Sequence, residues 1–408
     1  MANKNLTNAK RAKNDEFYTQ YGDIQKEIEA YLEYNTDVFR DKVVYCNCDD
    51  PFESNFFRYF VLNFNKLGLK QLITTSYKPS PVANTQLGLF GDDKTITKSK
   101  GLPAGRQGRP KINANKFIIN EVHDIDGDGE FNLKDIAKQL KANKNNEWTP
   151  LEGEGDFRSG ESINLLKQSD IVVTNPPFSL FREYVKQLFD YNKKFVIIGN
   201  MNAITYKEIF PLIKNNKMWL GAGKNDGRNV WFQIPDHYEK FHKVENGKKY
   251  AFVAGTIWFT NLDHGRRHQP LPLMTKAEVV KFSIKKPFQK YDNYDVIEVP
   301  LVKYIPSDYE GVIGVPISFL SKYSPEQFEI LGATQRGCHD EVPDTKKYDE
   351  YWEVRQNGKK TGSSGGKTNE NANLVENDGK KNYFINNEGR IIQSAYQRIF
   401  IRHKKVKK

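Results

Sequence analysis

The sequence has few cysteines and no long apolar run. Its 408 residues include only Cys46, Cys48 and Cys338, which are too few and too unevenly spaced for a disulfide framework. No apolar stretch is long enough to span a bilayer, and the first residues lack the apolar segment of a secretion signal. There is also no internal repeat. These absences predict a cytoplasmic protein without a membrane partner.

Basic and aromatic residues, in contrast, are plentiful. Lys and Arg number 62 against 51 Asp and Glu, giving a formal charge of +11, and aromatic residues make up 13% of the chain. The aromatic share indicates a folded core rather than global disorder. The positive balance is compatible with a polyanionic partner such as nucleic acid, because clustered Lys and Arg bind phosphates. Many basic proteins bind nothing acidic, so charge alone does not decide the partner.

Hydrophobic patterning in the first part of the chain predicts alternating strands and helices. An amphipathic helix is expected over residues 23–34, a β-branched strand over 42–46, an aromatic-rich helix over 54–66 and a second strand over 69–76. The last three elements have the strand–helix–strand order of a βαβ unit. After residue 150 strands and helices alternate again, with strands expected at 170–174 and 194–199 and helices at 180–191 and 206–214. One parallel sheet with flanking helices is the economical arrangement, which makes the fold α/β.

Composition divides the chain into two predicted domains. Residues 1–224 form the α/β domain, with an insertion at about 78–150 that contains the irregular stretch GLPAGRQGRP. Residues 225–408 form a smaller mixed α+β region of short aromatic strands. Within it, residues 356–380 are rich in Gly, Asn, Ser and Lys, which predicts a flexible loop. A last strand is expected at 396–401.

The stretch "IVVTNPPFSL" suggests a reactive site at the end of a buried strand. The β-branched run at 171–174 is typical of a central parallel strand, and the two prolines that follow Asn175 end its pairing. The Asn175 side-chain oxygen and the Pro176 carbonyl are two acceptors, which match the two hydrogens of an amino group on an aromatic ring. The prolines fix φ, and Phe178 offers a flat face for stacking a base. The alternative is a strand that merely ends in prolines beside a core phenylalanine.

These motifs resemble those of a known family. "NPPF" is similar to the catalytic motif of S-adenosylmethionine-dependent amino methyltransferases, whose adenine-modifying members carry Asp or Asn, Pro, Pro and an aromatic residue. More narrowly, "NDEFYTQ", "VVYCNCDDP", "GDFRS", "TNPPFSLFREYV" and "KFVIIGNMNAITYKEI" resemble the EcoRI-type adenine-specific DNA methyltransferases. The likeness extends to "GVPISFLSKYSPEQFEILG" and the terminal "RIFIR". It therefore covers most of the chain.

The resemblance implies a Rossmann-like methyltransferase sheet, a distal target-recognition region and roles for individual residues. The residues expected to hold a flipped adenine are Asn175, Pro176, Pro177 and Phe178; those expected to bind S-adenosylmethionine are Phe17, Tyr18, Thr19, Asp49, Asp50, Pro51, Asp156 and Phe157. An ordinary Asx turn is the alternative for the two acids at 49 and 50. No metal is expected in the chemistry, because methyl transfer from a sulfonium needs none.

Two departures from the family pattern concern the cofactor. The usual Gly-x-Gly after the first strand is replaced by Pro51-Phe52-Glu53-Ser54-Asn55, so close backbone approach must be arranged differently, for example through amides at the start of the next helix. The acidic residue usually found after the second strand is also missing, because residues 72–77 are LITTSY. The cofactor's ribose therefore lacks its usual acceptor.

Three other stretches admit a functional interpretation. "DIDGDGEFNLKD" at 124–135 has nearly the spacing of an EF-hand calcium loop, with a solvated acidic turn as the alternative. "HGRRH" at 264–268 and the basic tail at 402–408 are candidates for phosphate contacts, or equally for solvated basic segments. The C-x-C pair Cys46 and Cys48 lacks the second pair that a zinc site requires.

The predicted function is methylation of the exocyclic N6 amino group of adenine in double-stranded DNA at a specific sequence. The target atom is inaccessible within the duplex, so the base must flip out, and direct displacement follows without a covalent enzyme intermediate. The alternatives are a methyltransferase acting on RNA adenine or a protein amide, and a non-catalytic DNA-binding protein of the same fold. Whether a cognate restriction endonuclease is encoded nearby stays open.

Overall fold

The predicted strand at residues 42–46 forms as β1 (Val43–Cys46), in the middle of an eight-stranded sheet. The computed structural model describes residues 19–48, 54–76, 114–125, 135–136, 139, 145–223, 230–234, 241–283, 287–334, 342, 351–365, 371–375, 382–386, 389, 391–395 and 397–404. They belong to two units, Met1–Met201 with Leu220–Gly265, and Asn202–Trp219 with Arg266–Lys408. Among the helices of these residues, none is both long and apolar enough to cross a bilayer.

The large sheet lies in the first unit and has a parallel centre. Its order is β4-β3-β2-β1-β5-β6-β11-β7, and the strands are β2 (Gln71–Thr75), β3 (Asn115–Ile119), β4 (Glu147–Pro150), β5 (Ile171–Thr174), β6 (Lys194–Asn200), β7 (Trp219–Leu220) and β11 (Thr256–Thr260). The pairs β2–β1, β1–β5 and β5–β6 are parallel. The pairs β4–β3, β3–β2 and β11–β6 are antiparallel. The carboxyl ends of β2, β1, β5 and β6 therefore lie along one edge.

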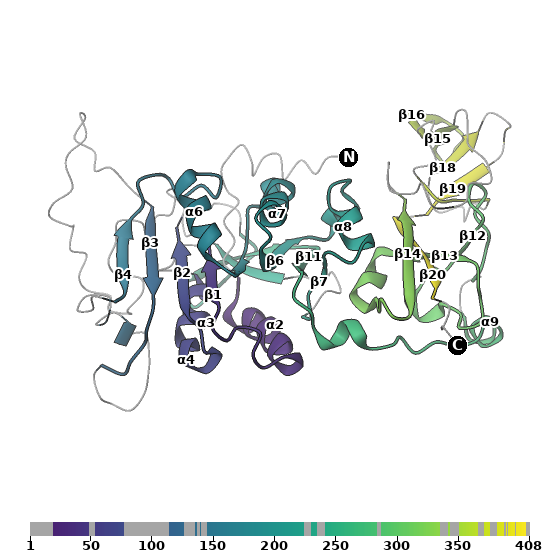
Figure 1. Cartoon of the computed structure of the whole chain (residues 1–408). Helices are drawn as coiled ribbons and strands as arrows, with labels where there is room; N and C mark the ends of the chain where they lie inside the picture. The colour runs from purple at the N-terminus through teal and green to yellow at the C-terminus, as the bar shows by residue number, and fades with distance from the viewer. Residues whose placement is uncertain are drawn as a thin grey trace. The chain divides into compact units, whose positions relative to one another are not determined.

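Helices cover both faces of this sheet (Figure 1). On one side lie α2 (Tyr21–Tyr34), α3 (Asn55–Leu62) and α4 (Phe64–Leu67), and on the other lie α6 (Gly160–Gln168) and α7 (Phe181–Asp190). The alternating side chains of the central strands are buried on both faces, which explains their continuous apolar runs.

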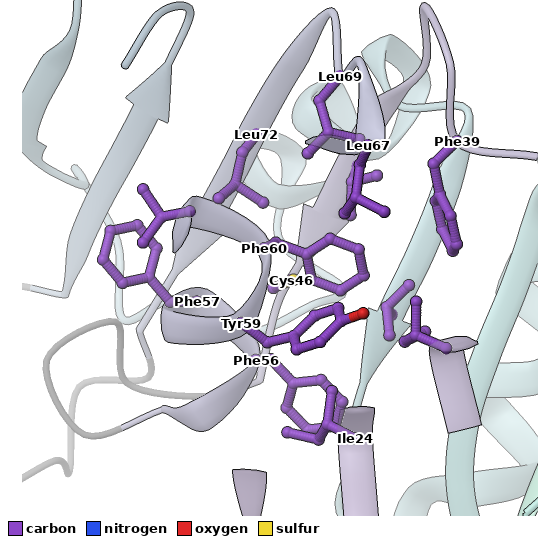
Figure 2. Close-up of a cluster of buried hydrophobic side chains, with 14 of the residues drawn as sticks. Ile24, Phe39, Cys46, Phe56, Phe57, Tyr59, Phe60, Leu67, Leu69 and Leu72 are labelled. Atoms are coloured by element: carbon purple, nitrogen blue, oxygen red, sulfur yellow. The ribbon is translucent and has the colours of Figure 1, made fainter. Parts of the chain in front are cut away.

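The aromatic residues of α3 form the centre of the core on its side. Figure 2 shows the rings of Phe56, Phe57 and Phe60 around the helix, among side chains such as Cys46 of β1 and Leu72 of β2. The predicted single helix at 54–66 is divided at Asn63, which caps the end of α3 and precedes α4, and Gly68 caps the end of α4 in the left-handed region with φ +63°. The spacing of aromatic residues thus predicted the buried face correctly and missed the break.

The predicted insertion at 78–150 is in part an extension of the sheet. Asn115–Ile119 and Glu147–Pro150 form β3 and β4, which extend the sheet antiparallel beyond β2. The composition of the insertion does not predict these two strands, because they depend on pairing with each other and with β2. The stretch GLPAGRQGRP lies outside the described residues.

The first strands that follow the predicted boundary at residue 224 belong to the first unit. β8 (Val230–Ile234), β10 (Lys248–Val253) and β9 (Lys243–Glu245) form a small antiparallel sheet in the first unit. The predicted strand at 255–260 is β11, which pairs with β6 in the large sheet from Asn200↔Thr256 to Val196↔Thr260. The predicted boundary at residue 224 thus differs from the division seen here, because this pairing ties residues after 224 to the first unit.

The second unit contains two further sheets. A four-stranded sheet has the order β12-β13-β20-β14, formed by β12 (Val296–Glu298), β13 (Val312–Pro316), β20 (Arg398–His403) and β14 (Phe328–Ala333). A five-stranded sheet has the order β16-β15-β18-β19-β17, formed by β16 (Lys360–Gly365), β15 (Tyr351–Val354), β18 (Tyr383–Asn386), β19 (Ile391–Ser394) and β17 (Asn373–Leu374). The helices are α8 (Phe210–Lys214), shorter than the predicted 206–214, and α9 (Lys276–Phe282).

The prediction of a flexible loop at 356–380 is wrong in part. Residues 360–365 and 373–374 are strands of the five-stranded sheet. Gly and Ser weaken strand propensity, but backbone hydrogen bonds to β15 require no particular side chain, so the composition did not prevent pairing. The assignment of this unit to DNA recognition stays a prediction.

Candidate active site

The Asn175 loop begins where β5 ends, at the carboxyl edge of the sheet. Residues 171–174 are fully buried strand, and Asn175 is also buried, with 8% of its surface exposed. Phe178–Leu180 then forms a 3₁₀ helix, in which the Leu180 N–H donates to the Pro177 carbonyl at 2.9 Å, and α7 follows directly. The loop is therefore a tight strand-to-helix connection.

Phe178 lies at the margin of the core. Its ring packs against the apolar cluster around α3 but is only partly buried. A side chain anchored on one face and accessible on another can stack on a flat ligand without rearrangement of the core.

Asn47 ties the end of β1 to the Asn175 loop. Its backbone carbonyl accepts a hydrogen bond from the Thr174 hydroxyl, and its side-chain oxygen accepts one from the hydroxyl of Tyr184 on α7. All three residues are buried, and burial is the main reason that the pKa of Tyr184 is raised well above its ordinary value. Because Thr174 directly precedes Asn175, this network fixes the loop after β5 beside the loop after β1.

Phe157 lies next to the same network. Its ring is 5.0 Å from the Tyr184 ring in an edge-to-face arrangement, and its carbonyl accepts from Nε2 of Gln187 on α7 at 3.1 Å. Phe157 is 5% exposed. The predicted cofactor residue is thus a buried aromatic packed against α7.

Asp156 is engaged by its neighbour Arg158. The carboxylate accepts from Arg158 Nη2 at 2.6 Å and from Nε at 2.9 Å, and also from the Arg158 backbone N–H at 2.8 Å. The Arg158 hydrogen bond is the main cause of the lowered pKa of Asp156. The carboxylate is therefore ionised, and its oxygens already hold one cation.

Gly155 brings this segment against the end of β2. It has φ +76°, and a Cβ built on it would lie 1.9 Å from the carbonyl oxygen of Ser76 and 3.0 Å from the side chain of Ala114. Only glycine allows this approach. Residues 155–157 consequently start at the end of β2 and reach α7 beside the ends of β1 and β5.

Thr19 is held at the start of α3. Its carbonyl accepts from the side-chain amide of Asn55 at 2.7 Å, and only 2% of the residue is exposed. Within the described residues, the Thr19 Oγ1 is buried and has no hydrogen-bond partner. Five of the predicted cofactor residues, Phe17, Tyr18, Asp49, Asp50 and Pro51, lie outside the described residues.

Comparison with known proteins identifies the family. A family model described as adenine-specific methyltransferase EcoRI matches residues 5–404. This chain belongs to that family. The predicted resemblance is confirmed, and with it the prediction of an adenine-specific methyltransferase rather than a non-catalytic binding protein.

Curated relatives agree with this assignment. The chain is 46% identical over 334 residues to Type II methyltransferase M.EcoRI of Escherichia coli, covering 81% of this chain and 89% of the relative. It is 36% identical over 329 residues to Type II methyltransferase M.MpnI of Mycoplasma pneumoniae, covering 79% and 83%. No solved structure gives a significant match.

The described residues fit the methyl donor expected for this family. The buried hydroxyl of Thr19, whose carbonyl bonds to Asn55 at the start of α3, and the buried Phe157 ring would offer such a ligand one polar and one apolar contact. The amides of Phe56 and Phe57 at the start of α3 are already capped by the Ser54 hydroxyl, at 3.1 and 3.4 Å. These two amides are therefore not available to replace the missing Gly-x-Gly in binding the cofactor.

The end of β2 does not replace the missing acid. The Thr75 hydroxyl bonds to Tyr45 at 3.0 Å, and the Ser76 hydroxyl accepts from the Asn115 N–H at 2.7 Å. Both hydroxyls therefore bond to neighbouring strands of the sheet.

Two of the three other candidate stretches, residues 124–135 and 264–268, have mainly structural partners. Asp135, the last position of the EF-hand-like stretch, is buried and accepts from the Ile125 N–H at 3.1 Å, while residues 126–134 are not described. No cluster of three metal-binding side chains occurs within the described part of the chain. In HGRRH, the Arg267 guanidinium lies 3.9 Å from the centre of the Trp219 ring, and His268 bonds to Glu326 at 2.9 Å. Of its basic side chains, Arg266 is the exposed one.

Asn47 is the residue that sequence reasoning missed. The available signal is a polar residue directly after the predicted strand at 42–46. Its partners, Thr174 and Tyr184, are 127 and 137 residues away in sequence, so only the fold reveals the network.

Replacing Tyr184 by phenylalanine tests this network. The change leaves the buried Asn47 oxygen without its donor and is expected to cost about 1–3 kcal/mol of unfolding free energy. Urea titration measures the loss. Tyr191→Phe, at the end of the same helix and partly exposed, should change stability by no more than about 0.5 kcal/mol. Equal effects in the two variants would mean that the Asn47 bond contributes nothing.

Proposed function

We propose that this protein transfers a methyl group from S-adenosylmethionine to the N6 amino group of adenine in a specific sequence of duplex DNA. The observation that carries the proposal is the position of Asn-Pro-Pro-Phe. It follows the carboxyl end of a buried central strand and is joined through Asn47 to the end of β1. In open α/β sheets ligands bind at this edge.

The sheet supports the finer fold assignment. A parallel centre in the order β2-β1-β5-β6, followed by an antiparallel β11, is the arrangement expected of a Rossmann-like methyltransferase sheet. In such a sheet the cofactor lies beyond β1 and β2 and the acceptor beyond the neighbouring strand. Thr19 and Phe157 would hold the cofactor, and Asn175 to Phe178 would hold the adenine.

Each residue of the loop has a role in this reaction. The Asn175 side-chain oxygen and the Pro176 carbonyl accept the two hydrogens of the adenine amine and orient its nitrogen lone pair. The prolines keep both acceptors fixed, and Phe178 stacks on the base after it has flipped out of the duplex. Bound S-adenosylmethionine would supply an electrophilic methyl group: the amine nitrogen would form a bond to the methyl carbon as the carbon–sulfur bond breaks, and the neutral thioether would leave. The amine would then give one proton to water, and no covalent bond to the enzyme would form.

Methylation of plasmid DNA with labelled cofactor tests the proposal. The purified protein should incorporate label into DNA, and mapping should place every modified base at adenine N6 within one sequence. RNA and protein acceptors are offered in parallel. Label that appears only in RNA or protein would contradict the proposal and favour the alternative substrates.

The relatives' names raise the question of a partner. Both are called Type II methyltransferases, a name given to the modification enzymes of restriction systems. A cognate restriction endonuclease and a cytoplasmic location therefore stay predictions for this chain.

A further inference from the structure

The second unit presents an exposed two-stranded hairpin with a strongly polar turn. β15 and β16 pair antiparallel, with Tyr351 opposite Gly365 and Val354 opposite Lys360. The turn at residues 355–359 and Lys360, the first residue of β16, have the sequence RQNGKK, and every one of these residues is exposed. The hairpin lies at one end of this unit (Figure 1), where β16 is the edge strand of its sheet.

Internal hydrogen bonds hold the turn in one conformation. The Arg355 N–H donates to the Lys359 carbonyl at 2.9 Å, and the Gly358 N–H donates to the Arg355 carbonyl at 2.8 Å. The Lys359 N–H donates to the Asn357 side-chain oxygen at 3.2 Å, and Gly358 has φ +79°. The backbone of the turn is therefore organised before any ligand arrives, which lowers the entropy lost on binding.

The base of the hairpin is fixed by the sheet. Tyr351 is 1% exposed and packs edge-on against Phe384 of β18 at 5.3 Å. Glu353 accepts from the Thr361 hydroxyl at 2.7 Å and from the Asn382 side-chain amide at 3.1 Å. The hydrogen bonds from Thr361 and Asn382, together with the charge of Arg355, lower the pKa of Glu353 at the base, while the turn itself carries only positive charge.

The chemistry of the turn suits one ligand. It has three cations, Arg355, Lys359 and Lys360, and no acid. Arg reads guanine by a bidentate contact and Gln reads adenine in the same way, whereas Lys suits phosphate. The major groove of B-form DNA admits a two-stranded β-ribbon, but the deep, narrow major groove of duplex RNA does not.

A second exposed hairpin among the described residues is a useful contrast. β9 and β10 are joined by Asn246 and Gly247, and Lys243 on β9 forms an ion pair with Glu245 at 2.7 Å. That turn is short and carries its own acid beside it. Its side chains are less suited to reading bases than those of residues 355–360.

We propose that the β15–β16 hairpin inserts its turn into the major groove of the target DNA, where Arg355 and Gln356 read base edges. Lys359 and Lys360 contact the flanking phosphates, and Asn357 and Gly358 shape the turn. This inference rests on the proposed function and adds to it the residues that select the sequence.

Alanine variants of the two reading residues test the inference. Arg355→Ala and Gln356→Ala should each lower kcat/KM at the mapped site by about ten- to a hundredfold. The ratio of kcat/KM at the mapped site to kcat/KM at sites that differ by one base pair should also fall. Lys359→Ala should weaken DNA binding equally on all sequences and reduce the salt slope by about one. S-adenosylmethionine affinity and the thermal unfolding midpoint should stay unchanged in all three.

Lys322→Ala is the matched control, since it removes one exposed positive charge elsewhere in the same unit. It should preserve both the rate at the mapped site and the site preference. If the wild-type enzyme methylates its site and the Arg355 and Gln356 variants keep the same rate and site preference, the hairpin assignment is wrong. The proposed function would then still stand. An equal loss in the Lys322 variant would overturn the hairpin assignment too, because charge would then explain the effect. A wild-type protein that methylates no DNA would instead refute the proposed function, and this inference with it.

Discussion

Asn175→Ala is expected to lower the methylation rate constant by roughly a hundred- to a thousandfold, the usual effect of removing one pre-positioned polar group from a reacting atom. The alanine removes the side-chain acceptor for one amine hydrogen, and the Pro176 carbonyl alone cannot orient the lone pair. Single-turnover methylation under saturating DNA and cofactor measures the loss. Affinity for S-adenosylmethionine and for DNA should change little, because neither depends on this oxygen.

Two further variants locate the effect in the side-chain oxygen. Asn175→Asp retains an oxygen at the same position and should keep substantially more activity than the alanine variant. Ser179→Ala changes a polar residue in the same loop, outside the tetrapeptide, and should leave the rate intact. Full turnover by Asn175→Ala would end the assignment of Asn175 as an acceptor.

The parts of the fold that sequence predicted are those set by local pattern. β5 is a continuous β-branched run, β1 and β6 contain shorter ones, and the spacing of the aromatic residues in α3 predicts a buried helix face. β3 and β16 were missed because neither has a strong pattern of its own. Both strands form by backbone pairing with a neighbouring strand, and a short stretch of sequence does not reveal its pairing partner.

The site divides in the same way. The tetrapeptide at 175–178 was predicted from its own chemistry, since two prolines after a buried strand are unusual in a sheet. Asn47 was missed because its partners come from β5 and α7. The engagement of Asp156 by Arg158 also depends on geometry, because two residues close in sequence do not by themselves define an ion pair.

Gly155 should tolerate no side chain. In Gly155→Ala the Cβ would overlap the Ser76 carbonyl, and alanine would also occupy the left-handed region at φ +76°. The conformational strain costs about 1–2 kcal/mol. The forced backbone shift adds typically 1–3 kcal/mol, so the total loss should be about 2–5 kcal/mol. Because a domain is commonly stable by only about 5–15 kcal/mol, this loss is large. Urea titration measures it.

Gly153→Ala is the matched control, because its added Cβ meets nothing within 4 Å and its residue is exposed. It should be neutral or slightly stabilising. Gly155→Ala should also weaken S-adenosylmethionine binding, measured by calorimetry under conditions where the variant is folded, because Asp156 and Phe157 move with the displaced backbone. If Gly155→Ala were as stable as Gly153→Ala and bound the cofactor equally well, the close approach to the end of β2 would have no part in forming the site. Loss of stability with full cofactor affinity would leave Gly155 a purely structural role and remove Phe157 from the cofactor site.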